Sequence, residues 1–219
     1  MTTIAAVEAL YSNAMACSSC FGPASVVNRA AIDVPQPRWV GPQYHSAHPR
    51  VLIVSINPGA GGDQQTSENI HLKNLLHRYS RGDVRLAEVF EFQKNHMRTW
   101  GRGGKFLSFF TTSLGLKLDE LSFLNIALCA TAGDKYPRGM LNNCYRTHTE
   151  EIAQALQPNV ILLSGSSTHS FAPLFTASSP TADVICMMHY ANREGAAAER
   201  VEHARIRGML ARHQPARGA

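Results

Sequence analysis

Residues 121–166 read LSFLNIALCATAGDKYPRGMLNNCYRTHTEEIAQALQPNVILLSGS, and this stretch decides the fold. Residues 121–128 are apolar apart from one serine and Asn125, which predicts a buried strand of a parallel sheet. Residues 150–156 have the pattern of a helix that a nearby proline ends, and residues 160–163 form a second apolar run. A strand, a helix and a second strand in this order predict a βαβ unit with parallel strands.

Asn125 does not fit a plain apolar core. A buried amide costs a few kcal/mol unless it is hydrogen-bonded. At the carboxyl end of a parallel strand, an amide points into the crevice where such sheets bind ligands. The position alone leaves two interpretations open, a ligand-reading amide and a structural amide whose hydrogen bonds are satisfied inside the core.

A second strand with a polar end lies closer to the N-terminus. Residues 50–56, RVLIVSI, are followed by Asn57-Pro-Gly-Ala-Gly-Gly, and α/β folds place their sites at such turns after buried strands. The glycines, Gly59 among them, let backbone N–H groups approach a ligand. The turn is neither a Walker loop, because no Gly-Lys-Ser/Thr follows, nor a GxGxxG motif. The proline biases Asn57 to an extended backbone, so its fixed amide is a candidate catalytic group.

The remaining segments complete an α/β pattern. A fourth buried strand is expected over residues 182–188. Helices are expected over residues 4–10, 68–80, 84–97, 106–114, 164–175 with a break at Pro173, and 196–213. The strands predict a central, mostly parallel, four-stranded sheet. No linker divides the chain, so we expect one domain over residues 1–219 with a flexible tail at residues 214–219.

Composition narrows the classes of protein to consider. The 219 residues are 44% hydrophobic, which suffices for the core of one domain. No apolar run approaches the length of a membrane-spanning helix. The N-terminus has an acidic residue and no basic head before its apolar residues, unlike a secretory signal. We therefore expect a cytoplasmic protein without a membrane partner.

The positive charge is concentrated in two segments. The net charge is +5; residues 71–105 hold eight Lys and Arg against three acids, and residues 193–219 hold six Arg against three Glu. Such a bias favours a polyanionic partner, although a solubilising surface has the same composition.

Four of the five cysteines fall into two pairs. Cys17 and Cys20 form a CxxC, and Cys129 and Cys144 form a second, wider pair. Disulfides are not expected in a cytoplasmic protein, whereas four thiolates can hold zinc or an iron–sulfur cluster. Cys186 lies in an apolar run and is most simply a core residue.

Three strand ends carry polar residues, namely Asn57, Asn125 and His189. With the cysteines, this ordered set resembles the uracil-DNA glycosylase superfamily, and most nearly its iron–sulfur branch from bacteria and archaea. In that branch a CxxC precedes the first motif, and a strand ending Asn-x-x-x-Cys is followed by a fourth cysteine. Asn125-Ile-Ala-Leu-Cys129 reproduces that spacing, and Cys144 lies where the fourth ligand is expected.

Two further segments carry the resemblance. Gly101-Arg-Gly-Gly, which includes Arg102, is similar to the branch's Gly-Arg-Ala-Gly, and EEIAQALQPNVILLSG matches its passage from helix to strand. The resemblance covers roughly residues 17–20 and 50–195. It implies a single domain with three layers, α/β/α, around the four-stranded sheet.

The resemblance also implies roles for the polar residues. Asn57 matches the residue that positions the attacking water, and Asn125 matches the amide that reads the Watson–Crick edge of the flipped uracil. His189 matches the histidine that stabilises charge on the uracil O2. Arg193, which follows this motif, and Arg102 in the basic turn are candidate DNA contacts. The four paired cysteines match the ligands of a 4Fe-4S cluster, with zinc as the alternative.

The chain departs from the branch in four places. It has Ser-Ile-Asn57-Pro-Gly where the branch usually has Gly-Glu-Ala-Pro-Gly, and this is more similar to the mismatch-specific and single-strand-selective branches. The second motif, usually His-Pro-Ser, is His189-Tyr-Ala. The Pro-Phe pair that supplies an aromatic platform for uracil is missing, and Trp100 is the candidate replacement. Residues 63–97 look like a helical insertion.

These residues predict a base-excision repair glycosylase that flips uracil, or a related deaminated base, out of DNA and hydrolyses its N-glycosidic bond. A neutral Asn57 cannot stabilise the sugar cation as a carboxylate does, and one charge pair at about 4 Å is worth roughly 4 kcal/mol at an effective dielectric near 20, or about a thousandfold in rate. We therefore expect a slow enzyme, or one selective for bases that leave easily, and we expect Asn57→Asp to accelerate it. We also expect the protein to be a monomer. A non-catalytic module that binds DNA lesions is the alternative, and excision of hypoxanthine or xanthine is a third hypothesis.

Overall fold

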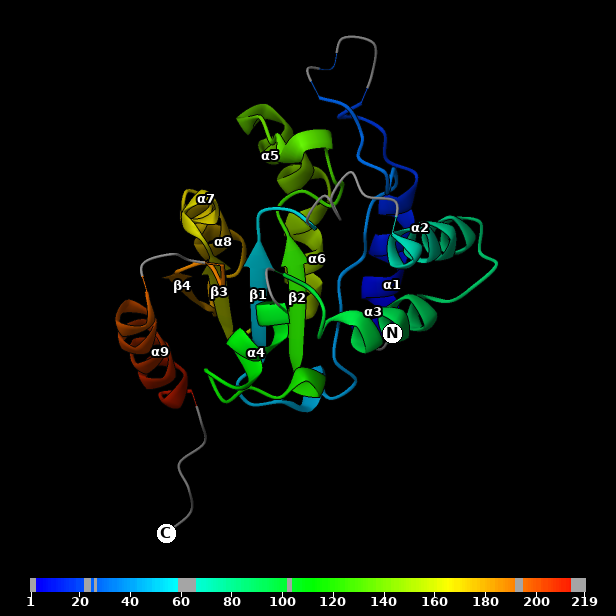
Figure 1. The fold of residues 1–219 in the computed structure, drawn as a ribbon. Helices are drawn as coiled ribbons and strands as arrows, with labels where there is room; N and C mark the ends of the chain where they lie inside the picture. The colour runs from blue at the N-terminus through cyan, green and yellow to red at the C-terminus, as the bar shows by residue number, and fades with distance from the viewer. Residues whose placement is uncertain are drawn as a thin grey trace. The chain divides into compact units, whose positions relative to one another are not determined.

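The computed structural model describes residues 3–21, 25, 27–58, 66–101, 104–191 and 195–213. Within this part of the chain, four parallel strands form one sheet in the order β2-β1-β3-β4 (Figure 1). The strands are β1 Val51–Ser55, β2 Leu121–Asn125, β3 Val160–Ser164 and β4 Asp183–Met187. The expected α/β class and the four expected strands are thereby confirmed. The two strands of the predicted βαβ unit, β2 and β3, are separated in the sheet by β1.

The register places apolar residues opposite each other through the centre of the sheet. In β1 and β3, Val51 lies opposite Val160, and the pairing continues in step to Val54, which lies opposite Leu163. β4 pairs with the other edge of β3, again in parallel. Every residue of β3 is buried, as expected for a parallel strand that is covered on both faces.

The contacts of the chain divide it into two compact units. The first unit comprises Met1–Arg38, Ser55–Gln93 and Leu124–Leu156, and the second comprises Trp39–Val54, Lys94–Phe123 and Gln157–Ala219. The boundary falls inside strands β1 and β2. The expectation of one domain over residues 1–219 stays a prediction.

The first unit contains most of the longer helices. They are α1 Thr3–Met15, α2 Ser67–Ser80, α3 Leu86–His96 apart from its last three residues, α5 Arg138–Cys144 and α6 Glu150–Leu156. Helix α1 packs against α6 and α2, and it extends beyond the expected residues 4–10. Thr66 caps α2 by accepting a hydrogen bond from the Asn69 N–H. Leu72, Leu75, Leu76 and Tyr79 of α2 are buried on one side of the helix. The two helices expected over residues 68–97 are confirmed.

Helix α5 and the segment after it were not expected from the sequence. A π-helix, Tyr145–Thr149, joins α5 to α6, and such wide turns inside helices are frequent at functional sites. The hydroxyl of Thr149 donates to the backbone carbonyls of Asn125 and Ile126, both at 3.0 Å. The π-helix therefore holds the chain where β2 ends.

The second unit contains α4 Lys105–Thr111, α7 Ser166–His169, α8 Ala172–Ser178 and α9 Ala196–Ala211. The helix expected over residues 164–175 is interrupted as predicted, but the break precedes Pro173: α7 ends at His169 and α8 begins at Ala172, so Pro173 lies in the first turn of α8. The first turn of a helix tolerates proline because its N–H groups have no partner within the helix. Short 3₁₀ segments occur in the two units at Tyr44–Ser46, Leu118–Glu120 and Ala132–Asp134.

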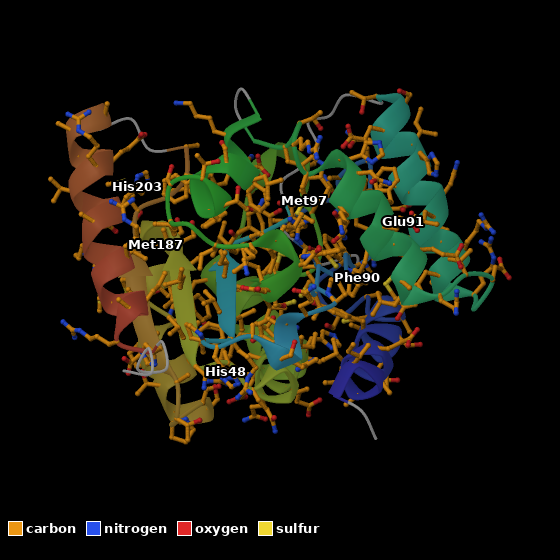
Figure 2. All side chains as sticks on the ribbon, turned by 90° about the horizontal axis from the view of Figure 1, so that it is seen from below. His48, Phe90, Glu91, Met97, Met187 and His203 are labelled. Carbon is orange, nitrogen blue, oxygen red and sulfur yellow. The ribbon has the colours of Figure 1, made fainter. Side chains whose placement is uncertain are left out.

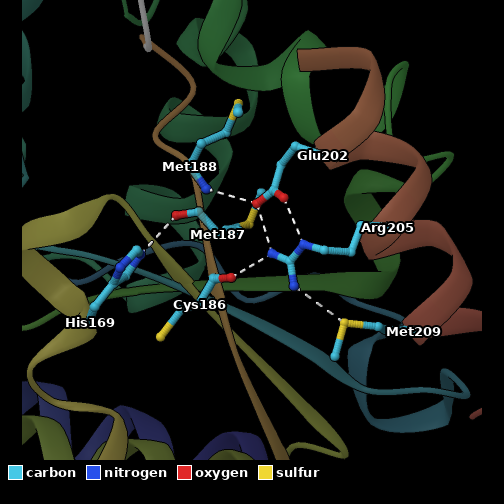
Figure 3. Close-up of polar contacts among 7 residues, drawn as sticks. All are labelled: His169, Cys186, Met187, Met188, Glu202, Arg205 and Met209. Carbon is cyan, nitrogen blue, oxygen red and sulfur yellow. Dashed lines mark hydrogen bonds and ion pairs between the residues drawn. The ribbon is translucent and has the colours of Figure 1, made fainter. Parts of the chain in front are cut away.

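Helix α9 is fastened to β4 by one carboxylate (Figure 3). Glu202 accepts the backbone N–H of Met188 at 3.0 Å and pairs with Arg205 at 2.7 Å. Arg205 also donates to the carbonyl of Cys186 at 2.7 Å. Further along α9, His203 packs edge-on against Phe109 of α4 with ring centroids 4.8 Å apart, and Figure 2 labels this histidine. These contacts fix the end of β4, where His189 follows.

Candidate functional site

Asn125 is the last residue of β2, and only 1% of its surface is exposed. The strand expected over residues 121–128 is therefore three residues too long. Ile126 and Ala127 still donate to the carbonyls of Ser55 and Ile56, but the neighbouring chain then reaches Pro58, which has no N–H to continue a ladder. This strand end places the Asn125 amide in the first unit, beside the turn that follows β1.

The side-chain NH₂ of Asn125 is anchored to the backbone. Oriented so that its hydrogens face acceptors, the nitrogen lies 3.1 Å from the Asn57 carbonyl and 3.2 Å from the Leu124 carbonyl. The side-chain oxygen then lies 3.2 Å from the nitrogen of Pro58, which carries no hydrogen to donate. The amide is held through its nitrogen, and its oxygen receives no hydrogen bond from Pro58.

Asn57 uses both of its side-chain hydrogens inside the protein. Its Nδ2 donates to Oδ1 of Asp134 at 3.1 Å and to the hydroxyl of Tyr136 at 2.8 Å. Because a carboxylate only accepts hydrogen bonds, this contact fixes which end of the Asn57 amide is nitrogen. Within the described residues the amide oxygen of Asn57 accepts no hydrogen bond, and it can therefore orient a water.

Asp134 and Tyr136 are site residues that the sequence analysis missed. Asp134 has a φ of 53° and follows Gly133, whose φ is 67°, and non-glycine residues in this region are uncommon and concentrate at functional sites. The hydroxyl of Tyr136 also accepts the N–H of Thr131 at 3.1 Å, and burial raises the pKa of this tyrosine. The sequence signal that could have revealed them is the presence of a carboxylate and a phenol on the loop that follows a buried strand.

The four predicted ligand cysteines line one cavity, also in the first unit. About 310 Å³ of it is filled by no protein atom, part of this being open to solvent. Its lining comprises Cys17, Ser19, Cys20, Phe21, Pro35, Leu128, Cys129, Met140, Cys144 and His148. The two thiols of the wider pair are buried, and those of the CxxC are half-buried. The structure thus brings together two pairs that are more than a hundred residues apart.

Several donors already face these sulfurs. The Leu128 N–H donates to Sγ of Cys144 at 3.3 Å, and the Asn143 side chain donates to Sγ of Cys20 at 3.4 Å. His148 lines the same cavity, and its Nε2 is buried without a hydrogen-bond partner among the described residues. N–H groups aimed at sulfur are a means by which proteins tune iron–sulfur clusters. The unpaired Nε2 of His148 beside the four thiols is consistent with a bound group whose own atoms, such as the sulfides of a cluster, would accept its hydrogen bond.

The spacing of the thiols bears on which group they fit. Burial, with the neighbouring thiols, raises the pKa of Cys129 and of Cys144 to about 12, and a bound metal would reverse this preference for the thiol form. Among the described residues, no three His, Cys, Asp or Glu side chains are grouped closely enough to hold a single ion. A tetrahedral zinc site requires sulfurs only about 4 Å apart, whereas a cluster spreads its ligands further. Four thiols supply the donors that either group requires.

His189 follows β4 in the second unit and has one defined hydrogen bond. Its Nδ1 accepts the N–H of Ala191 at 3.2 Å, so the hydrogen of the neutral ring is on Nε2. Burial lowers the pKa of His189, which keeps the ring neutral. Gly165 has a φ of +95°, and a Cβ there would approach the ring of His189 to 3.2 Å. His189 is thus a neutral Nε2–H donor whose place requires a glycine beside it.

Tyr190, at the position where the branch that the sequence resembles has proline, is packed among aromatic rings of the second unit. Its ring meets Phe106 edge-on at 5.2 Å, and Phe106 lies 6.1 Å from the ring of Trp100. A Cβ at Gly101, whose φ is +77°, would lie 2.5 Å from the Tyr190 ring. Trp100 is therefore part of this aromatic group, and its role as a platform for a base stays a prediction.

Three predicted site residues lie outside the described residues, namely Gly59, Arg102 and Arg193. The flexible tail predicted at residues 214–219 and the first residues of the predicted insertion lie outside them as well.

Comparisons with known proteins add no family assignment: no family model matches this sequence, and no curated protein matches it significantly. In the part of the chain that the structure describes, none of the helices has the length and apolar character needed to cross a membrane.

Proposed function

We propose that this chain is a DNA glycosylase that hydrolyses the N-glycosidic bond of uracil, or of a related deaminated base, after flipping the nucleotide out of DNA. The observation that carries the proposal is the pair of amides in the first unit. Asn125 keeps its oxygen as an acceptor at a buried strand end, and Asn57 beside it keeps an oxygen for a water. Selective hydrolysis of a base needs one group that recognises the base and, close to it, another group that positions the water.

The Asn125 oxygen supports a reading of the base. Uracil presents an N3–H donor, whereas cytosine presents an acceptor at the same position, so an oxygen there attracts one and repels the other. Deamination of adenine likewise creates a ring N–H, which keeps hypoxanthine within the proposal. The NH₂ of Asn125 is engaged by two backbone carbonyls. Pairing with uracil O4 as well requires the NH₂ to release one of them.

The mechanism assigns one role to each remaining group. The C1′–N1 bond breaks with its electrons on the base, which leaves as an anion, and positive charge develops on the sugar. Water, oriented by the Asn57 oxygen, adds to C1′ and loses its proton to solvent. His189 donates its Nε2–H to O2 of the departing base, and a preorganised donor of this kind typically contributes about 10²–10³ in rate.

The proposal extends to the metal site and the partner. Cys17, Cys20, Cys129 and Cys144 hold a 4Fe-4S cluster that ties the segment after α1 to the crossover between β2 and α5. This role is structural, so binding of the cluster is coupled to folding. The partner is DNA, which the two basic segments support, and the protein acts as a monomer in the cytoplasm.

Base release from labelled oligonucleotides tests the proposal. The substrates carry uracil, hypoxanthine or xanthine, single-stranded or paired, with enzyme in excess and alkaline cleavage of the abasic sites. We expect uracil release by the wild-type protein and a loss of at least about a hundredfold in His189→Ala. The matched control is Asn95→Ala, which removes an exposed amide on α3. Release of a purine alone would keep the chemistry and contradict the reading of uracil by Asn125.

A different result would support the alternative function. Salt-dependent DNA binding without release of any base, by a protein that contains its cluster, would identify a non-catalytic lesion-binding module. The observation that favours this alternative is that Tyr190, packed against Phe106, stands where the second motif of the resembled branch has proline.

A further inference from the structure

We propose that Asp134 supplies the negative charge that stabilises the sugar cation in this site, in place of a carboxylate in the first motif. This inference rests on the proposed glycosylase function and adds a charged group to it. Asn57 is neutral, yet its side chain is hydrogen-bonded to a carboxylate oxygen at 3.1 Å. The charge therefore comes from a residue 77 positions further along the chain.

The position of Asp134 follows from a short chain of hydrogen bonds. The Asn125 side-chain nitrogen lies 3.1 Å from the Asn57 carbonyl, and the Asn57 side-chain nitrogen lies 3.1 Å from Asp134. The carboxylate is thus two hydrogen bonds from the amide that reads the base, and it touches the residue that orients the water. All three residues belong to the same compact unit.

The charge acts only when the glycosidic bond breaks. The C1′–N1 electron pair leaves with the base, the sugar becomes positive, and the water that adds to C1′ gives its proton to solvent, so Asp134 takes no proton. In the free protein Asp134 is exposed, and solvent weakens its field. Bound DNA excludes that solvent, and the attraction to a nearby cation then grows as the local dielectric falls.

The loop backbone supports a functional position for this carboxylate. Asp134 adopts a φ of 53° directly after Gly133, a conformation that costs free energy for a side chain other than glycine. Tyr136 accepts the second hydrogen of Asn57 at 2.8 Å, so the phenol alone already restricts the amide. A carboxylate in addition adds charge as well as orientation.

The first experiment separates charge from orientation. Asp134→Asn keeps an oxygen that accepts from Asn57 but removes the charge, and we expect its single-turnover rate of uracil release to fall roughly tenfold or more. The double variant Asn57→Asp/Asp134→Asn exchanges the amide and the carboxylate of this hydrogen-bonded pair, so the pair is negatively charged again. It should regain most of the wild-type rate of uracil release. The control, Glu91→Gln, neutralises an exposed carboxylate on α3 (Figure 2). An unchanged rate in Asp134→Asn would overturn the inference.

The second experiment does not require turnover. It compares binding of DNA that contains a cationic pyrrolidine abasic nucleotide with binding of the neutral tetrahydrofuran analogue, so phosphate contacts cancel in the ratio. We expect the wild-type protein to favour the cation by about tenfold, and Asp134→Asn to reduce this preference to nearly one. If the wild-type protein and Asp134→Asn prefer the cationic analogue by the same factor, the inference is overturned, whether or not any base is released. If Asp134→Asn loses the preference but the wild-type protein releases no base, only the proposed function is contradicted.

Discussion

Asn57 and Asn125 share the polar chemistry of the strand ends, and the protein engages the NH₂ end of both side chains. Asn57 gives both hydrogens to Asp134 and Tyr136, and Asn125 gives its hydrogens to backbone carbonyls. Each amide therefore retains an oxygen. The Asn125 oxygen is suited to accept a ring N–H, and the Asn57 oxygen is suited to orient a water. A hydrolytic glycosylase needs both functions.

His189 carries a prediction about pH. Burial lowers its pKa below the ordinary value of 6.5, so the neutral ring with its Nε2–H persists as the pH falls through 6.5, and protonation occurs only at lower pH. Protonation of Nδ1 then breaks the hydrogen bond from the Ala191 N–H. We expect the single-turnover rate to be constant from about pH 8 to 6.5 and to fall below it.

The corresponding control is the His189→Ala protein, whose residual rate should not show that fall. A wild-type rate that begins to decline well above pH 6.5, or a decline that His189→Ala retains, would show that another group sets the profile.

Sequence reasoning found the residues at strand ends but not their partners. Asn57, Asn125 and His189 stand out because each is polar beside an apolar run. Asp134 lies 77 residues after Asn57, in a loop whose composition is ordinary for a turn. Only the folded chain shows that this carboxylate is hydrogen-bonded to the first motif, because loop conformation is not encoded by hydrophobic period.

At the scale of elements, the end of β2 depends on the π-helix. The hydroxyl of Thr149 is fully buried and donates to two carbonyls at the strand end. Helix α6 was predicted because its apolar residues recur with helical spacing. The seven-residue helix α5 was not, since it is short, contains a glycine and begins after a proline. The π-helix that aligns Thr149 with β2 depends on tertiary packing and has no sequence pattern by which it could be predicted.

Thr149→Val tests this arrangement. The change keeps the shape of the side chain and leaves two buried carbonyls with one donor fewer, so we expect a loss of roughly 1–3 kcal/mol in the free energy of unfolding. Urea unfolding of the protein with its cofactor measures it. Thr147→Val is the matched control, because the hydroxyl of Thr147 donates to the Asn143 carbonyl from an exposed position and should cost less than about 1 kcal/mol. Equal losses in the two variants would contradict the special role of the Thr149 hydroxyl.

At the scale of the whole molecule, the proposed cluster would hold a long irregular N-terminal segment. Between α1 and β1 the described residues contain only one short 3₁₀ segment, so little regular structure stabilises this part of the chain. The CxxC and the wider pair line one cavity. The pairing was predicted from the spacing of the cysteines, whereas the donors around the sulfurs, including Asn143 and His148, became evident only in the fold.

The cluster prediction concerns the purified protein. We expect a brown protein with broad absorption near 400 nm that disappears on oxidation, and about four iron atoms per chain. Cys144→Ser should lose the colour and unfold at a lower temperature, because metal binding is coupled to folding. Cys186→Ser, which changes the one cysteine that does not line the cavity, should retain the colour. A colourless protein with stoichiometric zinc would contradict the cluster.

The α/β class was predictable because four apolar runs with polar ends specify parallel strands whatever the loops between them do. The proposed function depends on finer geometry, namely on the two amide oxygens that accept no hydrogen bond from the described residues. The most direct measurement is single-turnover uracil release by the wild-type protein and by Asn125→Ala, at equal cluster content and with equal DNA binding. We predict release by the wild-type protein and none by the variant. Release at the same rate by both proteins would contradict the assignment of Asn125 as the residue that reads the base.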